Sequence, residues 1–212
     1  MTTGQPPKPA APAGPGRRER RRAETREKLY RIAMRLFAQH GFLATTTEAI
    51  TEAADVGQGT FFNYFPTKAH VLIVLAEKQI EKVAAAQREA EAGTTPMWDV
   101  FHTLMHAIVG ELAQSQALTR SLLTAFVAHD DVRELIRDML QRGRERLARM
   151  CALGQERQEI RRDRQAIDLA MTFQRAVLGT LLLWAMQSQG DLHAWLDKAL
   201  EDFWAAAGAK KD

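Results

Sequence analysis

The sequence predicts an all-α fold with about nine helices. Hydrophobic residues make up 46% of the 212 residues, which is enough for a core, and tyrosine occurs only twice. Strong helix formers such as Ala, Leu, Arg, Glu and Gln dominate, and long segments repeat their apolar residues at helical spacing. Residues 45–65 add two short helical segments joined by a tight turn, the pattern of a helix-turn-helix. We therefore expect a three-helix N-terminal domain followed by a larger helical domain.

The first 22 residues are assigned to a tail and a basic arm. Residues 1–16 are rich in Pro, Ala and Gly and lack bulky apolar side chains, so they are expected to be disordered. Residues 17–22 read Arg-Arg-Glu-Arg-Arg-Arg. This arm either stays solvated or contacts phosphates beside the helix-turn-helix.

Residues 23–66 are assigned to the helix-turn-helix domain. Its first helix is expected over about 23–40, with one apolar stripe, and Gly41 is expected to end it in a left-handed conformation. The second helix follows Thr46 and is expected to turn three residues inward: Ala49, Ile50 and Ala53. Asp55 occupies a turn position that favours a left-handed residue. The third helix starts near residue 57 and is expected to bury Phe61 and Phe65.

Residues 67–212 are assigned to a helical effector-binding and dimerisation domain. Its helices are expected at about 67–91, 96–114, 117–128, 131–153, 164–188 and 191–207, with Thr67 as the N-cap of the first. The segment 164–188 is apolar on two faces, whereas a surface helix needs only one. A homodimer through the last two helices accounts for the second face, and a central helix in a monomeric core is the alternative.

Charge and cysteine content suggest the compartment and the partner. Residues 1–70 hold 11 of the 29 basic residues but only 6 of the 26 acidic ones, so the basic excess coincides with the helix-turn-helix and favours a polyanionic partner. Cys151 is the single cysteine and no apolar signal segment opens the chain. The apolar run 176–186 is short and follows Arg175, so we expect a cytoplasmic protein without a membrane partner.

The stretch from about Thr25 to Leu72 resembles the DNA-binding domain of the TetR family of transcriptional regulators. The resemblance rests on the order and spacing of several segments: Leu-Phe-Ala-Gln-His-Gly-Phe (36–42), the threonines 45–47, Ile50 with Ala-Ala-Asp-Val (53–56), Gly-Thr-Phe-Phe-Asn-Tyr-Phe (59–65) and Pro-Thr-Lys (66–68). It implies a homodimer that places two third helices in successive major grooves of a palindromic operator. It also implies a repressor that a small hydrophobic or aromatic effector releases from DNA.

The matching positions indicate which residues contact double-stranded DNA. Hydroxyls at the start of the second helix suit phosphates, Gln58 suits the edge of an adenine, and Tyr64 and Lys68 suit phosphates. The full expected set is Thr46, Thr47, Gln58, Gly59, Thr60, Asn63, Tyr64 and Lys68. Two positions depart from the family pattern. Phe62 replaces the usual tyrosine and is expected to pack, and Glu48 stands where some members carry a base-reading arginine.

The C-terminal domain offers weaker candidates for an effector site. The set expected to contact a ligand is His102, Met105, His106, Phe126, Phe173, Arg175 and Trp184. Arg175 interrupts an apolar helix, so it binds an anionic ligand group, pairs across the dimer or reaches solvent. His102 and His106 have metal-binding spacing, but no third ligand follows at a convincing spacing, so neither a metal nor another cofactor is expected.

Two other classes of function stay open as alternatives. An effector-free dimeric DNA-binding regulator would share every DNA-binding feature. An enzyme on a helical scaffold has little support, because the sequence has no nucleophile elbow, phosphate-binding loop or HExxH motif.

Overall fold

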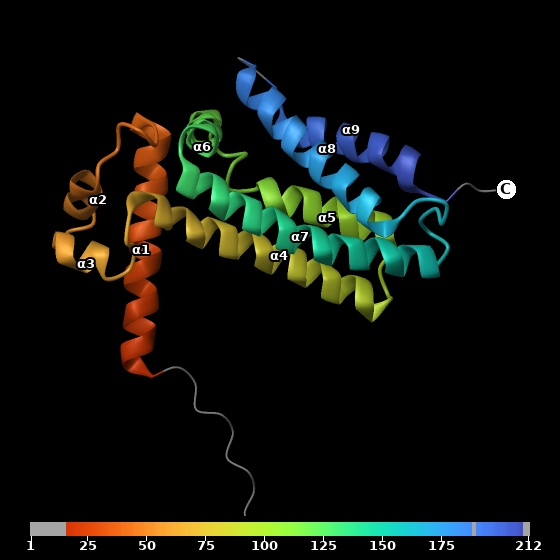
Figure 1. Cartoon of the computed structure of the whole chain (residues 1–212), viewed down its shortest axis with the longest axis horizontal. Coiled ribbons are helices and arrows are strands. Elements are labelled where there is room, and N and C mark those ends of the chain that lie inside the picture. Colours follow the sequence, from red (N-terminus) through yellow and green to blue (C-terminus); the bar gives the residue numbers. More distant parts are fainter. Residues whose placement is uncertain (1–15, 188–189, 210–212) are drawn as a thin grey trace, which may run out of the picture.

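The chain folds into helices throughout the described residues, 16–187 and 190–209, in this computed structural model (Figure 1). The element order is α1 (Arg17–His40), α2 (Thr47–Ala53), α3 (Gln58–Phe62), a 3-10 turn η1 (Lys68–Val71), α4 (Leu72–Ala92), α5 (Met97–Val109), α6 (Gln116–Ala128), α7 (Asp130–Glu156), α8 (Ala166–Met186) and α9 (Leu192–Ala207). No strand occurs in the described ranges beyond one isolated bridge between Ile160 and Gly208. The predicted all-α class with nine α-helices is confirmed.

Helix α1 begins earlier than the sequence predicted. Its first residue is Arg17, so the basic residues 17–22 form its first turns and not a separate arm. The N-terminus is capped because the Glu19 carboxylate accepts a hydrogen bond from the Gly16 amide at 3.0 Å. Residues 1–15, which were expected to be disordered, lie outside the described residues.

The backbone between α1 and α3 follows the expected turns with two differences. Asp55 has φ of 52°, as predicted for the turn of the helix-turn-helix. Gly41 has positive φ but its ψ is 154°, so it is not left-handed helical and lies in a region open essentially to glycine alone. Ala53 is exposed and Ala54 is buried in its place.

The helix boundaries of the C-terminal domain differ from prediction at two points. The expected single helix over 67–91 is split, because residues 68–71 form the 3-10 turn and α4 starts at Leu72. Thr67 makes no capping hydrogen bond, and its hydroxyl lies 2.8 Å from Nδ1 of His70. Helix α5 ends at Val109, five residues before the predicted end, and residues 110–114 form turns.

Two hydrophobic clusters organise the molecule. The N-terminal cluster joins α1, α2 and α3 to the start of α4 and to three residues of α6: Leu118, Leu122 and Ala125. The C-terminal cluster joins α4, α5, α7, α8 and α9 around a set of packed rings: Phe101, Phe173 and Phe203. In Figure 1 the helices α4, α5, α7, α8 and α9 form an elongated bundle, and α1 to α3 sit at one of its ends. The helix-turn-helix is thus anchored on α4 and α6.

Helix α8 carries an uncovered apolar face. Its exposed large side chains are Ile167, Leu178, Leu182, Leu183 and Met186. By length and composition alone this helix could cross a membrane, although core helices of soluble proteins meet the same criteria. Only 28% of its 18-residue apolar window is buried within the chain. Helix α8 is therefore apolar on a buried side and on an exposed side, although the exposed residues are not the second face read from the sequence, of which Leu169, Phe173 and Trp184 are buried.

Cys151 is fully buried in the C-terminal cluster, and burial raises the pKa of its thiol to about 12. Because only the thiolate reacts, we expect no reaction with a disulfide reagent at pH 8 while the protein is folded. In denaturant the same reagent should modify one thiol per chain. A rapid reaction of the native protein would contradict this burial.

Candidate functional site

Exposed and half-buried residues of α2, its N-cap, α3 and the turn after α3 form one mostly polar surface, which we call the reading surface: Thr46, Thr47, Glu48, Gln58, Gly59, Thr60, Phe62, Asn63 and Tyr64. Gln58, Gly59 and Asn63 are exposed and Thr60 is half-buried. The opposite side of α3 is anchored by Phe61, which is fully buried. No atom lies within 4 Å of a Cβ built on Gly59, so this side of the helix stands open. One side of α3 is thus packed against the domain and the other side is open to solvent, as reading of a major groove requires.

Helix α2 begins with a threonine cap, and it makes an acidic contact that the sequence did not predict. The Thr46 hydroxyl accepts a hydrogen bond from the Ala49 amide at 3.1 Å, so Thr46 is an N-cap. The Glu48 carboxylate accepts from the Thr47 hydroxyl and from Nε2 of Gln58, both at 3.2 Å. A backbone hydrogen bond is the main reason that the pKa of Glu48 is lowered. The free protein therefore holds Gln58 against an ionised carboxylate.

Replacing Gln58 with alanine should relax preference at a single base pair. The exposed amide suits an adenine edge, and it must leave Glu48 to reach a base. We expect the difference in binding free energy between the preferred base and its substitutes to fall by about 1 to 3 kcal/mol at that position. Competition binding with single-base variants of the operator measures this. Equal loss of affinity on specific and random DNA would exclude base reading by Gln58.

Tyr64 lies beside the first turns of α1. Cζ of Arg22 is 6.0 Å from the centre of the Tyr64 ring. A surface depression between them is lined by the half-buried Tyr64 and by the exposed Arg18, Arg21 and Arg22. We call these three arginines the basic face of α1. It extends the reading surface with positive charge, which sequence analysis had placed in a separate arm.

The side chain of Phe62 is more exposed than expected. Its ring packs edge-on against Phe61 at 5.5 Å between centroids, but 49% of the residue is accessible. Position 62 thus places an apolar ring on the reading surface, where it can touch a thymine methyl or a sugar but donates no hydrogen bond to a phosphate.

The Lys68 side chain bonds to the loop between α1 and α2, a role that the sequence did not indicate. Its ammonium donates to the carbonyl oxygens of Phe42, Leu43 and Thr45, at 2.6, 3.3 and 2.7 Å. It also lies 4.6 Å from the centre of the Phe42 ring. The three N–H donors are therefore directed at the loop between α1 and α2, and the phosphate contact of Lys68 stays a prediction.

Replacing Lys68 with methionine should lower the free energy of unfolding by about 2 kcal/mol, because the variant leaves these carbonyls without their charged donor. Urea denaturation measures the loss. Lys28→Met, at an exposed position of α1, is the matched control and should leave stability within about 0.5 kcal/mol of the wild type. Equal stability of both variants would show that water replaces the ammonium.

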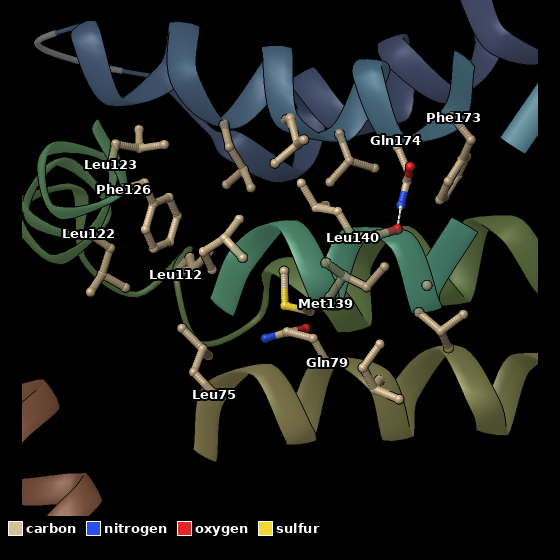
Figure 2. Close-up of a pocket in the computed structure, with 18 of the residues that line it drawn as sticks. Leu75, Gln79, Leu112, Leu122, Leu123, Phe126, Met139, Leu140, Phe173 and Gln174 are labelled. Carbon is tan, nitrogen blue, oxygen red and sulfur yellow. Dashed lines mark hydrogen bonds between the residues drawn. The ribbon is translucent and has the colours of Figure 1, made fainter. Parts of the chain in front are cut away.

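A second candidate site is a cavity of about 120 Å³ inside the bundle. It is lined from α4, α5, α6, α7 and α8. Figure 2 labels lining residues on α4, α6, α7 and α8 and in the turn after α5. Its walls include Leu75 and Leu122 from the N-terminal cluster and Val83 and Phe173 from the C-terminal cluster. The cavity therefore lies where the two hydrophobic clusters meet.

Gln79 is the polar residue in this wall whose hydrogen bonds are unmet. It is 8% exposed, and both its Oε1 and its Nε2 are buried without a partner. Figure 2 shows its amide rising from α4 towards Met139 of α7. The other polar lining groups are satisfied: the Gln174 amide donates to the Leu140 carbonyl and accepts from Arg144, and Thr119 donates to the carbonyls of Leu112 and Ser115. A buried amide with no partner costs free energy that a ligand's polar group would recover.

Two of the seven predicted ligand residues, Phe126 and Phe173, line the cavity. The other five lie elsewhere. Met105 and Trp184 are buried in the C-terminal cluster, and the indole of Trp184 donates to the Gly190 carbonyl. Arg175 is exposed on α8 among the apolar side chains of its open face. His102 and His106 are on the side of α5 that faces α9.

Gln79 could have been found in the sequence. It occupies the stripe position between Leu75 and Val83 in the predicted fourth helix, where a polar residue breaks an apolar series. Asp197 and His193 of α9, which contact His102 and His106, were also missed, because they lie about 90 residues away in the sequence.

Helix α4 joins this cavity to the helix-turn-helix. One turn around Gln79 carries Glu77 and Lys78, which point to α1: Arg26 pairs with Glu77 through two hydrogen bonds of 2.8 and 3.0 Å, and Lys78 pairs with Glu27 at 2.9 Å. The hydroxyl of Tyr30 donates to Glu111, just after α5, at 2.5 Å. A movement of α4 therefore acts on both the cavity wall and α1.

Comparison with known proteins assigns the helix-turn-helix to a family. Residues 29–75 match the model of bacterial regulatory proteins of the tetR family. These residues therefore carry the DNA-binding segment of the TetR family. Among curated relatives, the HTH-type transcriptional regulator TcmR of Streptomyces glaucescens is 37% identical over 95 residues, or 45% of this chain and 42% of TcmR. The HTH-type transcriptional repressor KstR of Mycolicibacterium smegmatis is 30% identical over 112 residues, or 50% of this chain and 52% of KstR. The chain thus spans about half the length of the curated relatives it matches.

Solved structures extend the likeness to the whole fold. A TetR-family regulator from Syntrophomonas wolfei aligns with a TM-score of 0.73 at 18% identity, covering 87% of this chain and 95% of its own. Thermus thermophilus FadR, a TetR-family repressor solved in complex with lauroyl-CoA, aligns with a TM-score of 0.61 at 25% identity, covering 88% and 97%. These relatives are transcriptional regulators and not enzymes.

Proposed function

We propose that this chain is a cytoplasmic, ligand-responsive transcriptional repressor of the TetR family, which binds a palindromic operator as a homodimer and is released by a small apolar effector. The observation that carries the ligand response is the apolar cavity with the unpartnered Gln79 amide at the junction of the two hydrophobic clusters. A buried amide without a partner lowers the stability of the protein, and a repressor that binds no effector gains nothing to offset this loss.

The reading surface and the basic face of α1 support operator binding. Exposed Gln58 and Asn63 offer amides to base edges, and the N-cap Thr46 and half-buried Tyr64 offer groups to phosphates. Arg18, Arg21 and Arg22 add the positive charge that dominates affinity for DNA. A palindromic operator follows if two copies bind together.

The apolar face of α8 supports the homodimer. Five exposed side chains, from Ile167 to Met186, follow its length, and Arg175 lies within this face. Pairing with the same face of a second copy, together with α9, would bury them symmetrically. In that arrangement Arg175 faces the partner subunit, which favours pairing across the dimer over ligand binding.

The cavity suits an effector with an extended apolar part and one hydrogen-bonding group. Its lining is almost wholly apolar, and Gln79 can both donate and accept. Thermus thermophilus FadR was solved with lauroyl-CoA, so acyl chains bound to a polar head are the first probes to test. The free volume of about 120 Å³ is below the roughly 300 Å³ at which typical ligand sites begin. An effector must therefore push the lining helices apart.

This expansion provides the release mechanism. Gln79 and Leu75 line the cavity on the same helix whose Glu77 and Lys78 hold α1 through Arg26 and Glu27. Displacing α4 would carry α1 with it and change the spacing between the two reading surfaces of a dimer. A ligand that binds the displaced state more tightly then lowers affinity for the operator by the same factor.

The test is a titration of the full chain into labelled DNA from the region upstream of its own coding sequence, with and without a panel of medium- and long-chain acyl-CoA thioesters. We expect binding well above random DNA, and at least a tenfold loss of affinity with one or more members of the panel. Specific binding that a broad ligand panel and cell extracts leave unchanged would instead establish the effector-free regulator. Binding no tighter than to random DNA would contradict the proposed function.

A further inference from the structure

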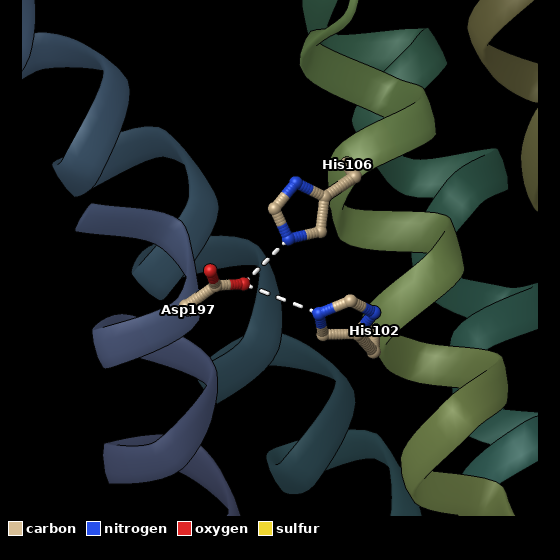
Figure 3. A group of neighbouring side chains, drawn as sticks. All are labelled: His102, His106 and Asp197. Atoms are coloured by element: carbon tan, nitrogen blue, oxygen red, sulfur yellow. Dashed lines mark hydrogen bonds and ion pairs between the residues drawn. The ribbon is translucent and has the colours of Figure 1, made fainter. Parts of the chain in front are cut away.

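A cluster of imidazole and carboxylate groups joins α5 to α9, outside the effector cavity. His102 and His106 lie one turn apart on α5, and both point to Asp197 of α9 (Figure 3). Nε2 of His106 is 2.6 Å and Nε2 of His102 is 3.2 Å from Oδ1 of Asp197. One ligand atom from each of the three residues lies within 4.8 Å of the other two. The cluster holds two of the chain's six histidines, and His193 adjoins it.

The three atoms are close enough to surround a transition-metal ion after small side-chain movements. Zinc binds imidazole nitrogen and carboxylate oxygen at about 2.0 to 2.2 Å, which separates ligand atoms in a tetrahedral site by about 3.4 Å. The two measured contacts of 2.6 and 3.2 Å need only small rotations of exposed side chains to reach this separation. Asp197 and His102 are 50% and 45% exposed, so both can adjust and solvent can reach the site.

His193 lies where it can fix the tautomer of His106 that binds a metal. Nδ1 of His106 is 2.8 Å from Nδ1 of His193, and the two rings stack with centroids 5.0 Å apart. Without a metal, Nε2 of His106 donates its hydrogen to Asp197. A metal ion would take the place of that hydrogen, and Nδ1 of His106 would then carry the hydrogen and donate it to Nδ1 of His193. Metal-binding histidines are commonly fixed by such a hydrogen bond on the other ring nitrogen.

The charge around the cluster suits a cation. Lys198, the basic residue next to Asp197, pairs with Glu201 and Asp202 at 3.2 and 3.3 Å and leaves the Asp197 carboxylate to the histidines. The sequence repeats the same spacing on both helices, with His102 and His106 on α5 and His193 and Asp197 on α9. Sequence analysis set a metal aside because it found no third ligand, and Asp197 supplies one.

We propose that His102, His106 and Asp197 bind a divalent transition-metal ion of the zinc type between α5 and α9, with His193 as the residue that positions His106. Two imidazoles and one carboxylate are a donor set that zinc accepts, with a fourth position left for water. The ion ties α5, whose Ile108 lines the effector cavity, to α9, which the proposed dimer uses. It would therefore stabilise the bundle independently of effector and DNA.

Zinc titration of the full chain, after treatment with a chelator and its removal, tests the site by calorimetry and by thermal unfolding. We expect one zinc ion per chain and a rise in Tm that the chelator reverses. His106→Gln and Asp197→Asn should each weaken zinc binding at least tenfold and abolish most of the rise in Tm. His193→Phe keeps a ring beside His106 but removes its hydrogen-bonding nitrogen, and should weaken binding about 10- to 100-fold. Each substituted residue has an exposed or half-buried side chain, so the variants should fold.

His40→Gln is the matched control, since His40 is exposed at the end of α1 and far from the cluster in the sequence. It should bind zinc as the wild type does. No zinc binding by the wild type, or equal affinity in the wild type, His106→Gln and Asp197→Asn, would overturn the proposal. Cobalt substitution adds a second readout, because a tetrahedral cobalt site has a visible absorption that Asp197→Asn should reduce.

Discussion

Replacing Arg18, Arg21 and Arg22 together with glutamine should remove most of the salt dependence of DNA binding. If each arginine of the basic face neutralises one phosphate, a dimer loses six contacts, and the slope of log affinity against log salt falls by about 5. Six contacts account for roughly a thousandfold change in affinity between 50 and 200 mM salt. Both operator and random DNA should be affected, because phosphate contacts carry no sequence information.

The matched control is a triple variant that removes the same charge elsewhere. Arg31, Arg35 and Arg88 are exposed on other faces of α1 and on α4, so their replacement with glutamine changes net charge equally. Fluorescence anisotropy at several salt concentrations compares the two variants. Equal slopes of log affinity against log salt for the two variants would mean that total charge, and not the basic face of α1, attracts DNA. Residues 17–22 would then be solvated and would not contact phosphates.

Replacing Gln79 with leucine should stabilise the free protein and impair its response to effector. The substitution removes a buried amide that has no hydrogen-bond partner and adds apolar volume to the cavity, so the free energy of unfolding should rise by about 2 kcal/mol. An effector that bonds to this amide would lose at least tenfold in affinity, because its polar group would be buried unpaired. Operator affinity without effector should stay unchanged, since Gln79 does not contact the reading surface.

Gln174→Leu is the matched control, because it removes a part-buried amide that has hydrogen-bond partners and should therefore change stability in the opposite direction. Gln174 lines the same cavity, but its amide is bonded to Arg144 and to the Leu140 carbonyl, so its removal should lower stability by about 1 kcal/mol. Urea denaturation at one fixed protein concentration compares the two variants, because a dimer's stability depends on concentration. Destabilisation by both substitutions would show that Gln79 is satisfied in solution, and would remove the main support for an effector.

The sequence predicted the helix-turn-helix well because its determinants are local. The Thr46 cap, the positive φ of Asp55 and the buried Phe61 each depend on residues within a few positions. The start of α1 was harder to predict from the sequence, because the charged residues 17–22 show no apolar stripe. Their helix is stabilised by the Gly16–Glu19 cap and by continuity with later turns. The spacing of apolar residues alone did not distinguish the 3-10 turn at Lys68 from the α-helix that follows it.

The candidate sites were harder because they combine distant segments. Lys68 reaches carbonyls of residues 42 to 45, and Asp197 meets His106 across 91 residues, so no spacing in the sequence reveals either contact. The cavity draws on five helices, and aromatic residues such as Trp184 that pack in the core look the same in sequence as those that line it. The sequence shows Arg175 as a charged residue in an apolar helix, but it does not indicate whether Arg175 contacts a ligand or a partner subunit. The exposed apolar face around Arg175 in the structure favours the partner subunit.

The central claim is that two copies of this chain read one palindromic operator. Selection of bound sequences from a random DNA library by the full-length protein tests it without knowledge of the regulated genes. We expect enrichment of an inverted repeat whose half-sites are about one helical turn apart, or a multiple of that distance. Enrichment of unpaired half-sites, or no enrichment over the starting library, would contradict it.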